Sequence, residues 1–125
     1  MASKKLPGGV TQRADGVLEK QTPHFDLSQI KSLVAKHGAK CFTYKAQQGV
    51  QDMKLATVEA VAAIAAIDAT GCFYKAMTSY HDANLWQDVY RVPTPKGDAN
   101  VKFQLVQPPP RSSFSPKLVI QFKAK

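Results

Sequence analysis

The sequence predicts an α+β fold in which amino-terminal helices pack on a carboxy-terminal antiparallel sheet. Apolar residues repeat at helical spacing between residues 26 and 67, and the pattern changes to strand-like alternation after Gly71. The connections between the expected strands are too short for a crossover helix, so neighbouring strands should run antiparallel. The 125 residues suffice for one compact domain with a single core. We therefore expect two layers, with helices covering one face of the sheet.

Residues 1–18 mix Lys, Gly and Pro without an apolar repeat, which is typical of a flexible tail. We assign the single domain to residues 19–125. The start of the chain shows no apolar segment with a cleavage signal, and the longest apolar stretch, residues 55–67, is shorter than the roughly 20 residues of a membrane span. We expect Cys41 and Cys72 to be buried free thiols, which favours the reducing cytoplasm and no membrane contact.

Three helices are expected in the first half of the domain. The first begins after Asp26, which can cap it, and ends at Gly38. A short strand is expected at 40–43, followed by a second helix within residues 43–53, although Gly49 lowers its helix propensity. The third helix is alanine-rich, and Thr57 is its expected cap. Its small apolar face should lie close against the sheet.

Four strand-like runs of aromatic and β-branched residues complete the domain, and they span residues 72–80, 85–92, 100–107 and 117–125. HDAN at 81–84, PTPKGDA at 93–99 and the long PPPRSSFSP at 108–116 are the expected loops. Core positions are expected for four large rings, which are Trp86, Tyr90, Phe103 and Phe122. The last strand is an outer strand that can accept a neighbouring strand from a partner protein.

The pairing register of the first hairpin is left open by the alternation. In a regular strand Phe73, Lys75 and Met77 share one side. If HDAN closes a four-residue loop, Lys75 lies opposite Tyr90, Met77 lies opposite Asp88, and Gln87 faces the reverse side. A bulge, or a change of one residue in the loop, would bring Gln87 to the side of Lys75.

The charge balance favours a polyanionic partner. Seventeen Lys and Arg against nine Asp and Glu give a formal charge of +8, which attracts nucleic acid or an anionic membrane at long range. The three histidines, His24, His37 and His81, stand singly, and with two cysteines they form no paired zinc-ligand spacing. We expect no metal site and no cofactor.

One stretch carries a resemblance to a known family. FYKAMTSYHDANLWQDVYR at 73–91, TPHFDLSQIKSLV at 22–34 and LVIQFKAK at 118–125 resemble the motility quorum-sensing regulator (MqsR) toxins of bacterial type II toxin–antitoxin modules. The resemblance implies a RelE-like fold and a ribosome-independent endoribonuclease that cuts mRNA at GC-containing triplets, chiefly GCU, and so inhibits translation and growth. It also implies a cognate MqsA-type antitoxin that binds zinc and DNA, so that operator DNA is reached only through the antitoxin.

The resemblance also implies site residues. The family's catalytic positions fall on Lys75, Gln87 and Lys123, and its RNA-recognising Tyr and Met fall on Tyr74 and Met77. To these we add Arg91 and Lys102 as cations expected to contact RNA. A further family tyrosine has no counterpart, because the matching position is Asn100 or Val101.

Metal-free RNA cleavage needs a base for the attacking 2′-hydroxyl, an acid for the leaving oxygen and a cation for the charge on phosphate. Lysine suits a phosphate, and a lysine near another cation becomes a candidate proton carrier because its pKa falls. Glutamine near neutral pH can only hydrogen-bond, and His24 is a secondary candidate acid or base.

Two other functions remain open at this point. A non-catalytic module for single-stranded RNA would share the basic, aromatic sheet. A regulatory domain that acts on DNA with a partner is less favoured, because no helix-turn-helix pattern is present in the sequence.

Overall fold

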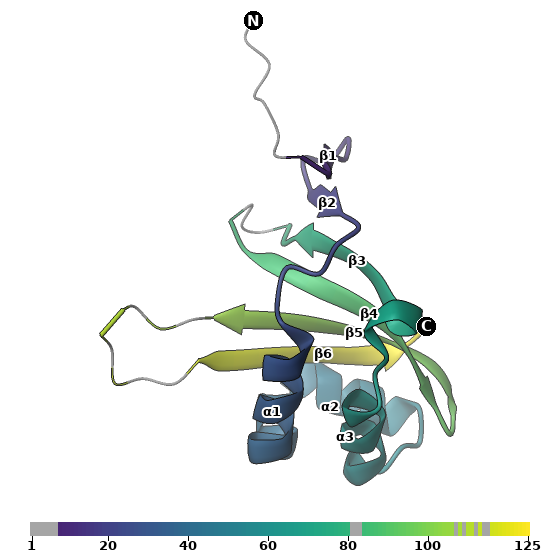
Figure 1. Ribbon diagram of the computed structural model, residues 1–125. Coiled ribbons are helices and arrows are strands. Elements are labelled where there is room, and N and C mark those ends of the chain that lie inside the picture. Colours follow the sequence, from purple (N-terminus) through teal and green to yellow (C-terminus); the bar gives the residue numbers. More distant parts are fainter. Residues whose placement is uncertain (1–7, 81–83, 107, 109, 112, 114–115) are drawn as a thin grey trace, which may run out of the picture.

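The computed structural model describes residues 8–80, 84–106, 108, 110–111, 113 and 116–125. They form one antiparallel sheet with helices packed on one of its faces (Figure 1), which confirms the predicted α+β class. The helical segments are α1 (Leu27–His37), η1 (Gly38–Cys41), α2 (Tyr44–Asp52), α3 (Thr57–Ala65) and α4 (Ala69–Cys72). The strands are β1 (Val10–Gln12), β2 (Leu18–Lys20), β3 (Phe73–Thr78), β4 (Trp86–Thr94), β5 (Gly97–Val106) and β6 (Lys117–Ala124).

The strands of this sheet lie in sequence order, and each is antiparallel to the next. The β4–β5 connection is tighter than the expected loop at 93–99, because Thr94 pairs with Gly97 across a two-residue turn. Gly97 has φ of +102°, a conformation that favours glycine. Residues 81–83 of the expected HDAN loop, and 107, 109, 112 and 114–115 near the last one, lie outside the described residues.

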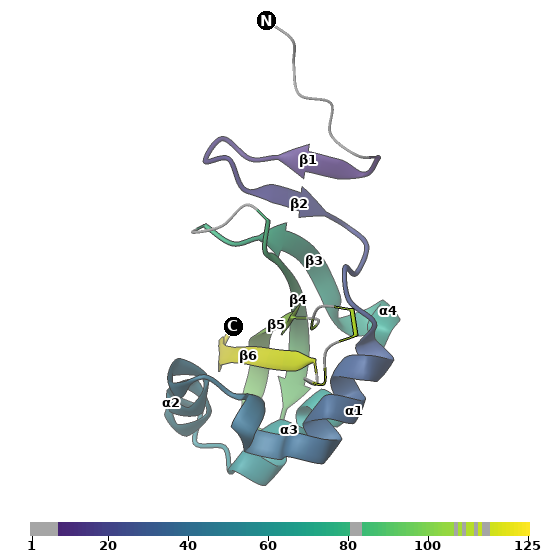
Figure 2. The ribbon, with the colours of Figure 1, turned by 90° about the vertical axis from the view of Figure 1, so that its left-hand side faces the viewer.

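The helices cover only part of the sheet, as Figures 1 and 2 show: α1, α2 and α3 gather over β4, β5 and β6, whereas β1 and β2 extend the sheet beyond them. The core between the layers contains the largest fully buried side chains, including Tyr90, Phe103 and Phe122. Trp86, also expected in the core, is only half-buried. In the described part of the chain, no helix is long and apolar enough to cross a membrane.

The amino-terminal part of the chain differs from the flexible tail that its composition predicts. Residues 10–20 form a β-hairpin, and β2 pairs with β3 through Glu19 and Met77. Val17 in the hairpin turn is only 3% exposed and packs on Met77 and Val89. Strands of three residues are too short to show the alternation of apolar and polar residues that indicates a strand in a sequence. Their structure therefore depends on these long-range contacts. Residues 1–7 lie outside the described residues.

Two local predictions in the helical half are wrong. The segment expected as a strand at 40–43 is mostly the 3₁₀ turn η1, and only Phe42 forms a single parallel bridge, with Ile120 of β6. Thr57 does not cap α3, because Ala56 occupies that position and its N–H donates to Glu59 Oε1 at 2.8 Å.

The outer edge of β6 is partly occupied from within the chain. Thr43 N–H donates to the Ile120 carbonyl at 3.1 Å, and the same threonine caps α2 through its side chain. A partner strand therefore meets an edge that is already used at its middle, which weakens the expectation that β6 pairs with another protein.

Gly49 lies inside α2 for a packing reason. A Cβ at this position would lie 1.9 Å from the Phe122 carbonyl oxygen and 2.9 Å from its carbonyl carbon. The helix can therefore lie directly against the backbone of β6 only because residue 49 has no side chain. The residue that lowers the helix propensity of α2 is the one that permits its docking.

We predict that Gly49→Ala lowers the free energy of unfolding by at least about 1–3 kcal/mol, because the overpacked atom is backbone and cannot rotate away. Denaturant unfolding measures this difference. Gln47→Ala, an exposed change on the same helix, is the matched control and should stay within about 0.5 kcal/mol of wild type. Equal stability of the two variants would contradict the close packing of α2 on β6.

Candidate functional site

The sheet face that is turned away from the helices carries most of the candidate residues, and we call it the open face. Strand alternation and the pairing registers identify its members. They include Lys75 and Met77 of β3, Gln87, Val89 and Arg91 of β4, Asn100, Lys102 and Gln104 of β5, and Val119, Gln121 and Lys123 of β6.

The pairing register of the β3–β4 hairpin brings Lys75 and Gln87 to this face together. Lys75 pairs with Val89 and Met77 with Gln87, whereas Phe73 pairs with Tyr90, so the ladder shifts between Phe73 and Lys75. The regular four-residue-loop register, with Lys75 opposite Tyr90, is therefore wrong, and the alternative of a one-residue change in the loop is confirmed, because the ladder is unbroken from Thr78 to Lys75. The bulge beyond Lys75 lets Phe73 pack on the core.

Tyr74 is the extra residue of this bulge, and its ring is held by cations. The Arg91 guanidinium carbon lies 3.8 Å from the ring centroid and the Lys75 Nζ lies 5.3 Å from it. The tyrosine is 41% exposed, so part of the ring remains available for stacking. Cation–π contacts of this kind hold an aromatic platform in place beside charges that suit phosphate.

Lys102 lies at the centre of the open face, between Val89 of β4 and Gln121 of β6. Partial burial lowers the pKa of Lys102, and the nearby charges of Lys123 and Lys75 lower it further. The cations that the sequence singled out on β3 and β6 are thus close enough to act on the lysine between them. This makes Lys102 the lysine of the group best suited to exchange a proton.

Gln87 lies between Met77 and the side chain of Gln104. Its Nε2 lies 3.5 Å from Gln104 Oε1, the upper limit for a hydrogen bond. Such a weak contact leaves the amide able to take a better partner. Met77 is only 7% exposed and packs with Val17 and Val89, so little of its side chain is available to RNA.

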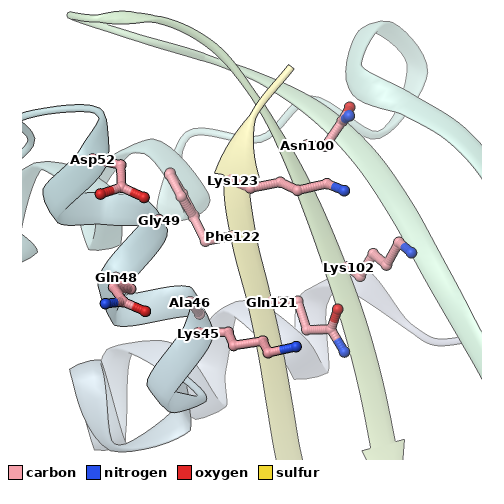
Figure 3. A pocket seen from close by; sticks show the side chains of 10 residues that line it. All are labelled: Lys45, Ala46, Gln48, Gly49, Asp52, Asn100, Lys102, Gln121, Phe122 and Lys123. Carbon is pink, nitrogen blue, oxygen red and sulfur yellow. The ribbon is translucent and has the colours of Figure 1, made fainter.

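A cleft of about 410 Å³ extends the open face from β5 across β6 to α2. Lys45, Lys102 and Lys123 line it, and Figure 3 shows their side chains extending over the same side of the sheet. Asn100 also lines the cleft, and its Oδ1 is buried without a hydrogen-bond partner in the described structure. Of the two candidates for the missing tyrosine position, Asn100 is the one on the open face, since Val101 is fully buried.

His24 is not brought to these lysines. Its ring stacks on Trp86 with centroids 5.1 Å apart, its Nδ1 accepts from Lys20 Nζ at 2.7 Å, and its backbone N–H donates to Asp88. Lys20 pairs with Ala76, on the helix side of the sheet. Burial and the Lys20 charge lower the pKa of His24, and both favour the neutral ring.

Asp88 holds this start of α1 against β4. Its carboxylate accepts from the backbone N–H groups of His24 and Phe25 at 2.9 to 3.1 Å, and the side chain is fully buried. Burial raises the pKa of Asp88, while these hydrogen bonds and Lys20 lower it.

The sequence reasoning missed two residues near the lysines. Glu19 of β2 forms an ion pair with Lys75, and Lys45 of α2 lines the cleft. No local pattern indicates either, because each reaches the site only through tertiary packing. Among the described residues, no group of three or more His, Cys, Asp or Glu side chains gathers as metal ligands do.

Comparisons with known proteins identify the family of the chain. The family described as "Motility quorum-sensing regulator, toxin of MqsA" matches residues 22–124. A protein of Escherichia coli (strain K12), "mRNA interferase toxin MqsR", is 32% identical over 108 residues, which cover 86% of this chain and 100% of that protein. The family match includes β3 to β6 and begins after β2.

We predict that Asp88→Asn lowers the free energy of unfolding by about 1–3 kcal/mol, because an NH2 group replaces one of the two carboxylate oxygens that accept backbone N–H groups. The pKa of Asp88 is raised above the ordinary 3.8. The proton-linked part of its contribution to the free energy of unfolding is therefore full below pH 3.8 and is lost as pH rises through the folded-state pKa. The advantage of wild type should therefore be larger near pH 3.5 than near pH 7, measured by denaturant unfolding. Asp98→Asn, an exposed carboxylate on β5, is the control. An advantage that grows with pH would contradict the raised pKa.

Proposed function

This chain belongs to the motility quorum-sensing regulator family of toxins, and on that premise we propose that it is an endoribonuclease that cleaves single-stranded mRNA. The proposed cleavage needs neither the ribosome nor a metal ion and occurs at GC-containing triplets, chiefly GCU. The observation that carries the proposal is the shared open face of Lys75, Gln87, Lys102 and Lys123. Cleavage of cellular mRNA then stops translation and growth.

The proposed chemistry is an internal transfer at one phosphate. The 2′-oxygen forms a bond to the adjacent phosphorus, the bond from phosphorus to the 5′-oxygen breaks, and a 2′,3′-cyclic phosphate and a 5′-hydroxyl result. One proton leaves the 2′-hydroxyl and one is added to the 5′-oxygen. Negative charge builds on the phosphate oxygens between these two transfers, so fixed cations accelerate the reaction.

The residues of the open face fit these needs. Lys75 and Lys123 supply positive charge to the phosphate, and Gln87 donates a hydrogen bond to a phosphate oxygen or a base edge. Lys102 is our candidate for the proton transfer to the leaving oxygen, because its pKa is lowered. His24, on the helix side of the sheet, has no part in this scheme.

RNA binding is proposed to follow the sheet from β3 to α2. Tyr74 offers an exposed ring for one base beside Arg91, and base stacking of this kind contributes about 1–3 kcal/mol. The cleft beyond Lys123, which Asn100 also lines, holds the next part of the strand. A duplex would hide both the ring faces and the base edges.

The proposed partner is a cognate MqsA-type antitoxin that binds zinc and DNA and keeps the toxin inactive in the cytoplasm. The family description names this chain's relatives as toxins of MqsA. Contact with operator DNA would then occur only through the antitoxin. Mixing the purified toxin and antitoxin before adding RNA tests the inhibition directly.

A non-catalytic RNA-binding module is the alternative. Incubation of the purified protein with a GCU-containing RNA oligonucleotide and EDTA separates the two functions. Cleavage to fragments with cyclic phosphate ends supports the nuclease, whereas binding without cleavage supports the module. If cleavage required added metal, the nuclease function would stand and only its metal independence would be contradicted.

We predict that Lys75→Ala abolishes cleavage and growth arrest while the fold is retained, because the lysine is on the open face and outside the core. Cleavage of the oligonucleotide and the melting temperature are both measured. Lys36→Ala, an exposed lysine on α1, removes the same charge at a distance and should retain wild-type cleavage. Retained activity in folded Lys75→Ala would remove Lys75 from the site.

We predict that Lys45→Ala weakens RNA binding by loss of one phosphate contact in the cleft. Binding is measured in the inactive Lys75→Ala background at several salt concentrations. The slope of log K against log salt should become less steep by about 0.7, which is the counterion release expected for one phosphate contact to a single strand. Lys36→Ala should leave the slope unchanged. The same slope for both variants would mean that RNA does not reach the cleft.

A further inference from the structure

The β1–β2 hairpin lies before the residues that the family model matches, yet it adjoins the proposed active site. β2 pairs with β3 beside Lys75, and Leu18 N–H donates to Thr78 Oγ1 at 2.9 Å. The hairpin turn places Val17 against Met77 and Val89 on the open face. This part of the chain therefore forms the wall of the site next to β3.

Glu19 connects the hairpin to the proposed chemistry. Its Oε2 accepts from Lys75 Nζ and lies 3.6 Å from Arg13 Nη1. The side chains of Lys75 and Glu19 are 19% and 20% exposed, so both ends of the pair have little freedom to move. In the described residues, the ion pairs are those of Arg13 with Asp15 and Glu19 and of Lys75 with Glu19.

A second set of contacts holds the hairpin turn to the segment after β3. Tyr80 Oη donates to Asp15 Oδ2 at 2.8 Å, and Arg13 Nη2 donates to the same carboxylate at 2.7 Å and to Tyr80 Oη at 3.1 Å. The hydrogen bond from Tyr80 is the main cause of the lowered pKa of Asp15. Arg13 therefore contacts Glu19 through one nitrogen, and Asp15 and Tyr80 through another.

We propose that Glu19 is a positioning residue for Lys75, and that the β1–β2 hairpin is part of the catalytic unit; the proposal rests on the proposed ribonuclease function. A lysine side chain has four rotatable bonds and loses rotamer freedom when it is fixed. The carboxylate fixes the amine before RNA arrives. Because an ammonium has three N–H donors, Lys75 can keep one on Glu19 and direct the others at the phosphate.

The proposal gives opposite expectations for turnover and for RNA affinity. A carboxylate on a basic face repels RNA, so its loss should leave the KM unchanged or lower it. Its loss also frees Lys75 to move, and displacements of about 1 Å in a catalytic group reduce rates by roughly a hundredfold. A residue that only stabilised the fold would not produce this combination.

The test compares the full-length wild type with Glu19→Gln and Asp98→Asn on a GCU-containing oligonucleotide. Glu19→Gln should lower kcat by about tenfold to a hundredfold, with equal or lower KM and a melting temperature near that of wild type. Asp98→Asn removes the same charge from an exposed position on β5 and should keep the wild-type kcat. A kcat in Glu19→Gln that equals or exceeds that of Asp98→Asn would overturn the positioning role.

A second measurement does not depend on cleavage. Brief acetylation with a water-soluble reagent, followed by mass spectrometry, reports how freely each lysine amine reacts. Lys75 should react several-fold more slowly than exposed Lys36 in the wild type and approach the rate of Lys36 in Glu19→Gln. Equal rates in the wild type would overturn the ion pair. Wild type that binds but does not cleave RNA would overturn the proposed function and with it the catalytic role, even if Lys75 is protected.

Discussion

The pairing of β3 with β4, with its bulge at Tyr74, is the constraint on which the proposed site depends. In a regular strand Phe73 and Lys75 would share a face, and either the core would lose a ring or the lysine would be buried. The extra residue lets Phe73 pack on the core while Lys75 points to the open face. Tyr74, the extra residue, lies beside Arg91. On the loop side of the bulge the unbroken ladder pairs Met77 with Gln87, so the hairpin register places the amide on the face of Lys75. The register and the bulge together bring the amine, the amide and the ring to one part of the sheet.

The lysines on the open face repel one another, and only some of them have a carboxylate partner that reduces this repulsion. Lys75 has Glu19 as a partner, whereas the pKa of Lys102 is lowered by burial and by the lysines on either side. A bound phosphate would relieve the repulsion at Lys102 and Lys123, which makes the unpaired side of the face the natural path for a polyanion. The hairpin therefore gives Lys75 an ion-pair partner, whereas Lys102 and Lys123 lie farther along the proposed path of the RNA.

The sequence predicted the fold class, the order of the main elements and the strands that carry the candidate residues, because those depend on local period and on short connections. It did not predict the hairpin register, since alternation assigns faces only within one strand and neither fixes the loop length nor locates a bulge. The β1–β2 hairpin was missed because three-residue strands have no period, and Val17 is buried only by contact with β3 and β4. Glu19 and Lys45 belong to the site for the same long-range reason. The roles of the individual site residues stay predictions.

The proposed function and the stability of the fold depend largely on opposite faces of one sheet. On the helix side, Asp88 ties the start of α1 to β4, and Gly49 lets α2 lie against the backbone of β6. On the open face, the side chains of Lys75, Gln87 and Lys123 contribute nothing to the core cluster. The exception is the patch of Val17, Met77 and Val89, where the hairpin packs on the open face itself. Changes in this patch should therefore alter stability and catalysis together, whereas changes at the lysines should separate them.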